Sequence, residues 1–169
     1  MASSEPTFVR ERPNAFLKLF FKLPPLLYRG PFAVGLSKRC ILRLTTTGRT
    51  SGLPRTICIS FAPLDDHYVV FSGFGIRSQW YQNVRANPDV TIQIGRRRLA
   101  ATAVPVADPA RRRDLMLMMR DRSATCGPPR WMRPLLRLTR AFDYDGEIRL
   151  AVEQAEALPV VELFPRPTT

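Results

Sequence analysis

Short runs of alternating apolar and polar residues, separated by turn-forming residues, recur along this chain. In one such run Ile57, Ile59 and Phe61 alternate with smaller or polar neighbours, which is typical of a half-buried strand. The same alternation, or a short apolar run bounded by turn residues, occurs five more times. The predicted strands are 40–45, 55–62, 68–71, 90–94, 99–106 and 158–164.

Helical periodicity appears between and around these strands. Asn14 and Ser78 stand at positions typical of N-terminal helix caps, and Pro109 suits the first turn of a helix. The predicted helices are 15–23, 78–86 and 109–122, with a mixed, partly helical pattern over 135–157. Six strands with few helices predict a mainly β, α+β chain, built as a small β-barrel with flanking helices.

The chain of 169 residues suits one domain. Residues 1–13 are polar and read as a flexible N-terminal tail, so we expect a single domain over 14–169. The amphipathic helix 15–23 carries Lys18 and Lys22 on one narrow polar face and either packs under the domain or lies on a membrane surface. Its apolar stretch is too short to span a bilayer and does not resemble a secretory signal. We therefore expect a cytoplasmic protein, with peripheral contact to the inner face of the cell membrane as the alternative for this helix.

The composition limits which kinds of partner and site this chain can have. The formal net charge is +12, which favours an anionic partner. His67 is the only histidine, so a zinc site or a histidine-based triad lacks its usual parts, and we expect no metal. The three cysteines, Cys40, Cys58 and Cys126, show no metal-ligand or redox spacing. We expect them to be thiols in a reducing compartment.

The segment from Thr45 to Arg55, TTTGRTSGLPR, is the strongest candidate for binding chemistry. Gly48 and Gly52 allow tight turning and close backbone approach to a ligand, and successive backbone N–H groups can form an anion-binding nest. Arg49 and Arg55 supply guanidinium groups suited to phosphate. An ordinary solvated hairpin turn would show the same composition, so the residues alone leave both readings open.

The same segment resembles the signature of the deazaflavin-dependent nitroreductase family. The resemblance runs in order along the chain, from about residue 42 to 106, with the last strand as a further anchor. The matching stretches are LTTTGR at 44–49, SG at 51–52, PR at 54–55, YVV at 68–70, SGFG at 72–75, WYQN at 80–83, RANP at 85–88 and LPVVEL at 158–163.

The resemblance implies a split β-barrel, similar to FMN-binding barrels, and coenzyme F420 as cofactor. It also implies that the Gly48–Arg55 loop holds the cofactor phosphate and that residues from two later stretches lie beside the deazaflavin ring. The residues carried over as cofactor-binding are Thr47, Gly48, Arg49, Thr50, Ser51, Gly52, Arg55, Thr56, Ser72, Gly73, Trp80, Tyr81 and Asn83. Aromatic residues on a short helix are more often core residues, and Trp80 and Tyr81 can serve both purposes.

The implied activity is a hydride transfer from reduced F420 to a quinone, nitro compound or enone. No catalytic residue is assignable, because the cofactor carries the chemistry; Ser72 and Tyr81 are weak candidates for polarising the acceptor oxygen. The alternatives are an FMN-dependent reductase and a non-catalytic lipid, fatty-acid or cofactor binding protein at a membrane surface. We expect no nucleic-acid partner, and a monomer or homodimer.

Three departures from the family pattern bear on the site. Thr50 stands where a lysine is usual, which removes one cationic phosphate contact. The turn 73–79 is shorter than usual. The tyrosine-rich stretch expected before the final strand is replaced by 130–157, where Tyr144 is the only tyrosine. Substrate contacts are therefore not carried over to this stretch.

Overall fold

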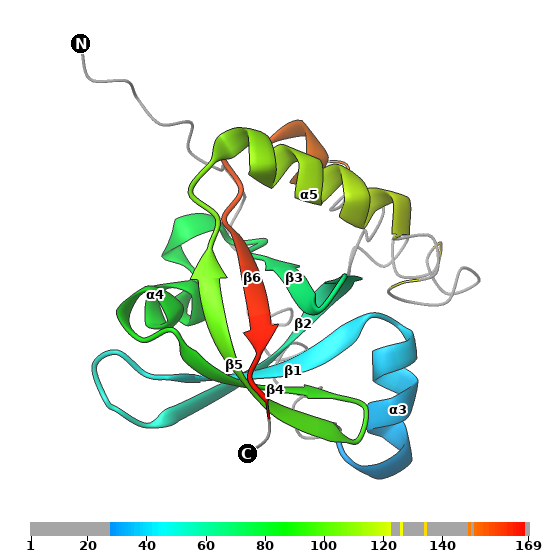
Figure 1. The fold of residues 1–169 in the computed structure, drawn as a ribbon, viewed down its shortest axis with the longest axis vertical. Coiled ribbons are helices and arrows are strands. Elements are labelled where there is room, and N and C mark those ends of the chain that lie inside the picture. Colours follow the sequence, from blue (N-terminus) through cyan, green and yellow to red (C-terminus); the bar gives the residue numbers. More distant parts are fainter. Residues whose placement is uncertain (1–27, 123–125, 127–133, 135–148, 150, 168–169) are drawn as a thin grey trace.

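The protein is built on a closed antiparallel barrel of six strands in the order β1-β2-β3-β6-β5-β4 (Figure 1). The computed structural model describes residues 28–122, 126, 134, 149 and 151–167. The strands are β1 Ile41–Thr47, β2 Pro54–Leu64, β3 His67–Phe71, β4 Asp89–Ile94, β5 Arg97–Pro105 and β6 Val160–Pro165. The helices are α3 Gly30–Lys38, the short 3-10 helix η1 Gly75–Arg77, α4 Gln79–Ala86 and α5 Pro109–Arg122. The predicted β-barrel with flanking helices is confirmed.

The barrel interior is one apolar core. On β1, the inward positions Leu42 and Leu44 are fully buried, while the residues between them are partly exposed, as the twofold repeat of a strand requires. Helix α4 adds Trp80 and Val84 to the same core. The barrel therefore holds α4 directly against its interior residues.

A second apolar core lies between the outer barrel wall and α5. Val69 belongs to this outer core and its neighbour Val70 to the inner one, because successive strand residues point to opposite faces. Leu115, Met116 and Met119 supply the buried face of α5. The wall under α5 is thus buried on both sides, and its strands read as continuous apolar runs.

All six predicted strands are present, and the remaining differences concern their ends. β1 continues to Thr47 rather than ending at residue 45, and β6 begins at Val160 rather than 158. The helices predicted over 78–86 and 109–122 correspond to α4 and α5. The predicted helix 15–23 and most of 135–157 lie outside the described residues.

Helix α3 was not predicted from the sequence. Pro31 suits the first turn of a helix, but Gly30 and the interior Gly35 are poor helix formers and no side chain caps the start, so local preference is a weak signal for this helix. Tertiary contacts anchor its start: the buried Tyr28 hydroxyl donates to the Ile41 carbonyl at 2.9 Å and accepts from the Gly95 backbone N–H at 3.2 Å.

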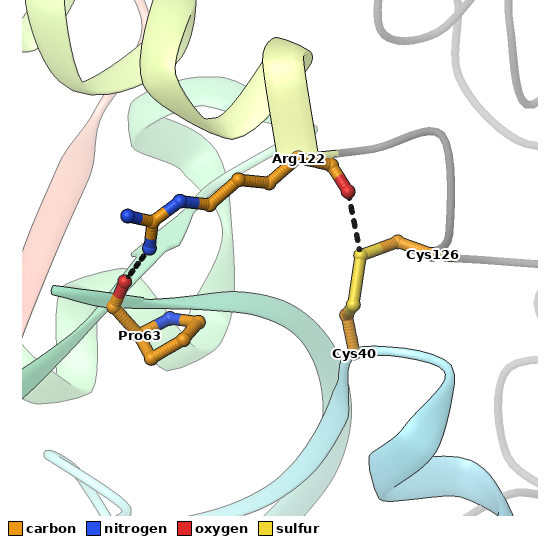
Figure 2. The surroundings of a disulfide bond; sticks show 4 residues. All are labelled: Cys40, Pro63, Arg122 and Cys126. Carbon is orange, nitrogen blue, oxygen red and sulfur yellow. Dashed lines mark hydrogen bonds between the residues drawn. A yellow bond between two sulfur atoms is a disulfide. The ribbon is translucent and has the colours of Figure 1, made fainter.

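The expectation of three free thiols is wrong for two of the cysteines. Cys40 and Cys126 form a disulfide, with their Cα atoms 5.1 Å apart (Figure 2), whereas Cys58 is free. The two partners are 86 positions apart in sequence, so spacing along the chain gave no sign of their meeting.

A membrane-spanning helix and a metal site, neither of which the sequence leads us to expect, can be looked for only in the described part of the chain. Within it, no helix is long and apolar enough to cross a membrane. Nor do three or more His, Cys, Asp or Glu side chains gather among those residues in a group that could hold a metal ion.

Candidate functional site

The β1–β2 connection forms a closed hairpin loop held by its own backbone. The Gly48 N–H donates to the Leu53 carbonyl at 2.9 Å, and the Gly52 N–H donates to the Gly48 carbonyl at 2.7 Å. A Cβ on Gly48 would lie 2.7 Å from the Ser51 Oγ and 3.2 Å from the Leu53 carbonyl oxygen. Gly52 has a φ of +66°, which glycine adopts without strain. Both glycines are therefore needed for the shape of the loop.

Asn83 joins this loop to helix α4 from beneath. Its side chain is 4% exposed. Its Oδ1 accepts from the Arg49 backbone N–H at 3.1 Å and from the Arg49 Nη1 at 3.4 Å, and its Nδ2 donates to the Thr46 Oγ1 at 3.2 Å. Buried polar groups are stable only when their hydrogen-bonding capacity is used. Asn83 meets this condition by fixing the position of the loop.

A second α4 residue holds the Arg49 side chain. The Arg49 Nη1 donates to the Gln79 Oε1 at 3.0 Å as well as to Asn83. Gln79 and Asn83 are four residues apart on a helix and so lie on one face. One end of the Arg49 guanidinium is thus bound to α4, which gives the residue a role in closing the loop onto the helix.

The outer side of the loop keeps donors for a ligand. Among the described residues, no acceptor contacts the backbone N–H of Thr50 or Ser51. The Ser51 Oγ accepts from the Leu53 N–H and from the Arg55 Nη2, which leaves the hydroxyl proton available to donate. Arg55 is exposed, and within the described residues its side chain makes only this 3.4 Å hydrogen bond.

This donor set suits a phosphate. Two neighbouring amides, hydroxyl groups and a guanidinium supply short hydrogen bonds and positive charge at one place. The residues present therefore fit the phosphodiester of F420. Thr50 adds a hydroxyl but no charge, so Arg55 is the most available cation of this loop.

The turn after β3 continues the site toward α4. Ser72 is fully buried; its hydroxyl donates to the Gly75 carbonyl at 2.8 Å and its N–H to the Pro159 carbonyl at 2.8 Å. The Gln82 side chain of α4 donates to the Ile76 carbonyl of η1. Ser72 thus shapes the turn, and its hydroxyl is not free to polarise a substrate. Gly73, also predicted to lie beside the ring, is partly exposed in the same turn.

The two predicted ring-side aromatics have different surroundings. Trp80 is 8% exposed and belongs to the barrel core. Tyr81 is half-buried and meets Trp80 edge-to-face, with ring centroids 6.0 Å apart. In the described part of the chain the Tyr81 hydroxyl has no hydrogen-bond partner. Trp80 is therefore first a core residue, and Tyr81 is the one of the pair with a polar group to offer.

The resolved pKa shifts belong to the barrel wall rather than to this loop. Burial raises the pKa of the Cys58 thiol from 9.0 to about 12, against the opposing effect of the nearby Arg43. Burial also raises the pKa of Tyr28. Both groups stay neutral at physiological pH, so neither behaves as an activated nucleophile or base.

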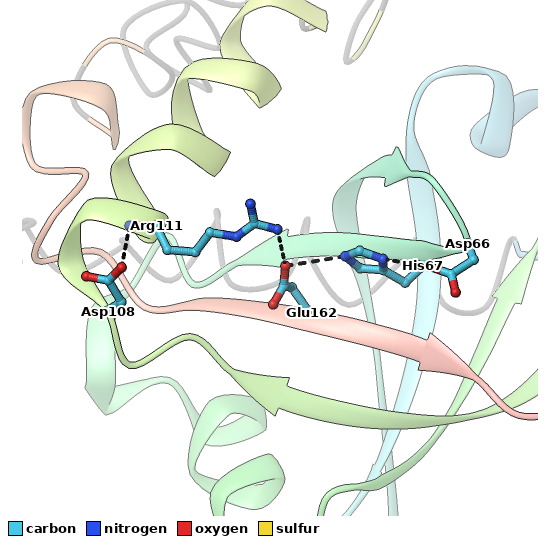
Figure 3. Close-up of polar contacts among 5 residues, drawn as sticks. All are labelled: Asp66, His67, Asp108, Arg111 and Glu162. Carbon is cyan, nitrogen blue, oxygen red and sulfur yellow. Dashed lines mark hydrogen bonds and ion pairs between the residues drawn. The ribbon is translucent and has the colours of Figure 1, made fainter.

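A second polar cluster fastens α5 to the barrel. The Arg111 Nη2 donates to the Glu162 Oε1 at 3.0 Å, and the same oxygen lies 3.3 Å from the His67 Nε2 (Figure 3). The His67 Nδ1 lies 3.2 Å from the Asp66 Oδ1, and the imidazole stacks on Phe164. The single histidine is thus tied to two carboxylates and a ring as part of the packing under α5.

The structure brings together most of the predicted site residues and adds two. Residues 48–52 lie in the loop, Thr47 and Arg55 flank it on β1 and β2, and Asn83 lies beneath it on α4. Thr56 lies next to it on β2, where its hydroxyl pairs with Thr45 at 3.0 Å. Sequence reasoning missed Gln79, and it placed Thr46 in the candidate segment without listing it among the cofactor-binding residues. The four-residue spacing from Asn83 signals the first, and the strand alternation, which points Thr46 inward with Leu42 and Leu44, signals the second.

Comparison with known proteins gives a family match over this region. A family model described as F420H(2)-dependent quinone reductase matches residues 29–126, which include the loop and α4. The F420H(2)-dependent quinone reductase Rv1261c of Mycobacterium tuberculosis (strain ATCC 25618 / H37Rv) is 43% identical over 68 residues, covering 38% of this chain and 46% of that protein. A putative F420H(2)-dependent quinone reductase, Mb1292c of Mycobacterium bovis (strain ATCC BAA-935 / AF2122/97), matches to the same extent. The matched segment thus spans about half the length of these relatives.

Solved structures share the barrel at lower identity. The conserved hypothetical protein Rv2991 from Mycobacterium tuberculosis has a TM-score of 0.53 and 15% identity, covering 80% of this chain and 78% of that chain. At this identity the likeness concerns the fold alone.

Proposed function

The chain belongs to the F420H(2)-dependent quinone reductase family, and from this membership we propose that it binds coenzyme F420 and reduces a quinone. One observation carries the proposal. Two of the stretches that resemble the family, the loop at 44–55 and the helix segment WYQN at 80–83, meet through the hydrogen bonds of Arg49 to Asn83. A phosphate-binding loop and a ring-side helix need this proximity to hold one elongated cofactor.

The roles of the residues follow from their surroundings. The amides of Thr50 and Ser51 and the guanidinium of Arg55 would bind the cofactor phosphate, while Asn83 holds the loop in place. The bound cofactor supplies the hydride. For the acceptor oxygen we propose Tyr81 as the hydrogen-bond donor rather than Ser72, because the Ser72 hydroxyl already donates to Gly75.

Direct titration tests the cofactor assignment. Purified full-length protein would be titrated with oxidised F420 at low salt, with F420 fluorescence as the readout and FMN as the matched control ligand. We expect micromolar or tighter binding of F420 and weaker binding of FMN. Failure to bind F420 at low salt, or preference for FMN, would contradict the proposal.

Turnover tests the acceptor. With reduced F420 in excess, we expect faster oxidation in the presence of a quinone than with a nitro compound or an enone. Tyr81→Phe should lower kcat and leave F420 affinity unchanged, because only a donor to the acceptor is removed. If Tyr81→Phe and wild type have equal kcat, Tyr81 is not that donor.

The proposal also covers the domain organisation, the oligomeric state and the cellular location of the protein. It places one domain over 14–169, as a monomer or homodimer in the cytoplasm, with peripheral membrane contact through 15–23. Flotation with anionic vesicles, comparing the full chain with a variant carrying Lys18→Glu and Lys22→Glu, tests the membrane contact. Equal flotation of the two proteins would argue against a role for this helix.

A further inference from the structure

Two cysteines far apart in sequence meet at one corner of the barrel. Cys40 lies between α3 and β1, and Cys126 follows α5; the sulfur atoms are bonded and the Cα atoms are 5.1 Å apart (Figure 2). This Cα separation lies in the normal range for a disulfide. The backbone therefore presents the pair in bonding geometry without rearrangement.

Contacts that do not involve sulfur hold Cys40 and the end of α5. The Cys40 backbone has a φ of 59°; its N–H donates to the Ser37 carbonyl and its carbonyl accepts from the Phe61 N–H. On the other side, the Arg122 guanidinium at the end of α5 donates to the Pro63 carbonyl of β2 (Figure 2). The backbone of Cys40 and the end of α5 are thus held in place by contacts that do not depend on the disulfide.

The reduced state also has a place for the released thiol. The Cys126 Sγ lies 3.4 Å from the Arg122 carbonyl oxygen at the end of α5. A disulfide sulfur has no proton to donate, whereas a thiol donates weakly. Reduction would therefore exchange a covalent bond for a hydrogen bond at the same atom.

From these contacts we propose that Cys40 and Cys126 form a reversible redox pair that exchanges with low-molecular-weight thiols and disulfides. In the reductive direction, a thiolate attacks the Cys40 sulfur and releases Cys126 as a thiolate, which takes up a proton. A second thiol then displaces Cys40 from the mixed disulfide. Two thiols are oxidised to one small disulfide, and the protein gains two protons and two electrons.

Attack at Cys40 follows from the exposure of the two residues. Cys126 is 8% exposed, whereas Cys40 is partly exposed. The third cysteine, Cys58, serves as an internal reference, because burial raises its pKa to about 12 and a thiol that stays protonated exchanges slowly. The chain therefore contains a reactive pair and an unreactive control.

The pair lies at the end of β1 opposite the candidate loop. Cys40 directly precedes Ile41, the first residue of the strand, and the loop follows Thr47, its last residue. The strand is paired along its length with β2 and over its middle with β4. Oxidation should therefore change how firmly the end of α5 is attached, and with it the stability of the fold, without changing the loop.

Thiol counting after equilibration in glutathione buffers tests the proposal. The full chain would be equilibrated with oxidised or reduced glutathione, then denatured with N-ethylmaleimide present and analysed by intact mass. We expect one adduct after oxidation and three after reduction; Cys58→Ser should give none and two. A peptide map should show Cys40 linked to Cys126 in the oxidised sample.

Unfolding in urea supplies the second readout. We expect reduction to lower the urea midpoint of wild type and of Cys58→Ser, and to leave the midpoint of Cys126→Ser unchanged. Three adducts at every glutathione ratio would overturn the proposal, because no disulfide forms. One adduct at every ratio would also overturn it, because the bond would then be permanent.

Discussion

Removing the Asn83 side chain should release the loop from α4. In Asn83→Ala the Arg49 N–H loses its acceptor, the Arg49 guanidinium keeps only Gln79, and the Thr46 hydroxyl loses a donor. Two neutral hydrogen bonds contribute about 1 kcal/mol each, and leaving a buried partner unsatisfied costs about 1–3 kcal/mol. We expect a total loss of about 3–5 kcal/mol in the free energy of unfolding, with the partly exposed guanidinium contact adding little.

A second variant separates the position of the loop from the stability of the fold. Asn83→Asp has nearly the same shape and keeps the acceptor for Arg49, and the Thr46 hydroxyl can donate to it in exchange for its 3.4 Å hydrogen bond to the Arg55 carbonyl. Its stability should stay within about 1 kcal/mol of wild type. A buried carboxylate beneath the loop would repel a bound phosphate, which at an intermediate effective dielectric costs about 1 kcal/mol. This corresponds to roughly fivefold to tenfold weaker F420 binding.

The assay pairs urea unfolding with F420 titration for the two Asn83 variants and for Gln79→Ala. The Gln79 variant, which loses one exposed contact to Arg49, should lie between wild type and Asn83→Ala in both measurements. If Asn83→Ala matches wild type in stability and in F420 affinity, Asn83 does not position the loop. If Asn83→Asp binds F420 as tightly as wild type, the loop does not hold the cofactor phosphate.

Three further changes test the loop and the barrel wall. Gly48→Ala should lose about 1–3 kcal/mol of stability, because its Cβ would lie 3.2 Å from the Leu53 carbonyl oxygen. Gly35→Ala should gain up to about 1 kcal/mol in its helix, because no atom lies within 4 Å of the added Cβ. Urea midpoints compare the two variants, and equal effects would refute the steric argument. Arg55→Ala should weaken F420 binding roughly tenfold to a hundredfold with little change in unfolding, and equal binding would remove Arg55 from the site. Folding raises the pKa of Cys58 from 9.0 to about 12, so between these pH values the unfolded chain loses a proton that the folded chain keeps. The free energy of unfolding should therefore fall with rising pH by about 1.4 kcal/mol per pH unit more in wild type than in Cys58→Ala. Parallel pH profiles of the two proteins would contradict this.

The barrel could be predicted because its strands obey a local rule. Each wall residue faces either the interior or the outside, so alternation along β1, β2, β4 and β5 is visible in the sequence. Helix α3 could not be predicted in this way, since Gly30 and Gly35 disfavour a helix locally and contacts such as that of Tyr28 with Gly95 decide its place. Long-range contacts of this kind leave no sign in the local pattern of apolar and polar residues.

The candidate site could be predicted in part. The motif residues identified the loop, because glycines and hydroxyl residues between two strands are visible in sequence. They did not reveal that Asn83 lies under the loop rather than at an open surface, or that the Ser72 hydroxyl is engaged by Gly75. The disulfide of Cys40 with Cys126 was missed for the same reason: which side chains meet across the barrel depends on its closure.

The hydrogen bonds of Arg49 to α4 change which groups of the loop are available to bind the cofactor phosphate. The sequence suggested that two guanidinium groups bind the phosphate, but the Arg49 guanidinium already donates hydrogen bonds to Gln79 and Asn83 of α4, and Thr50 carries no charge. That leaves Arg55 and the backbone N–H groups of Thr50 and Ser51 as the principal donors. Amides bind an anion only when the backbone holds them convergent, so loop shape matters as much as charge. Changes at Gly48 and Asn83, which hold the loop in shape, should therefore affect cofactor affinity about as strongly as changes at the exposed Arg55.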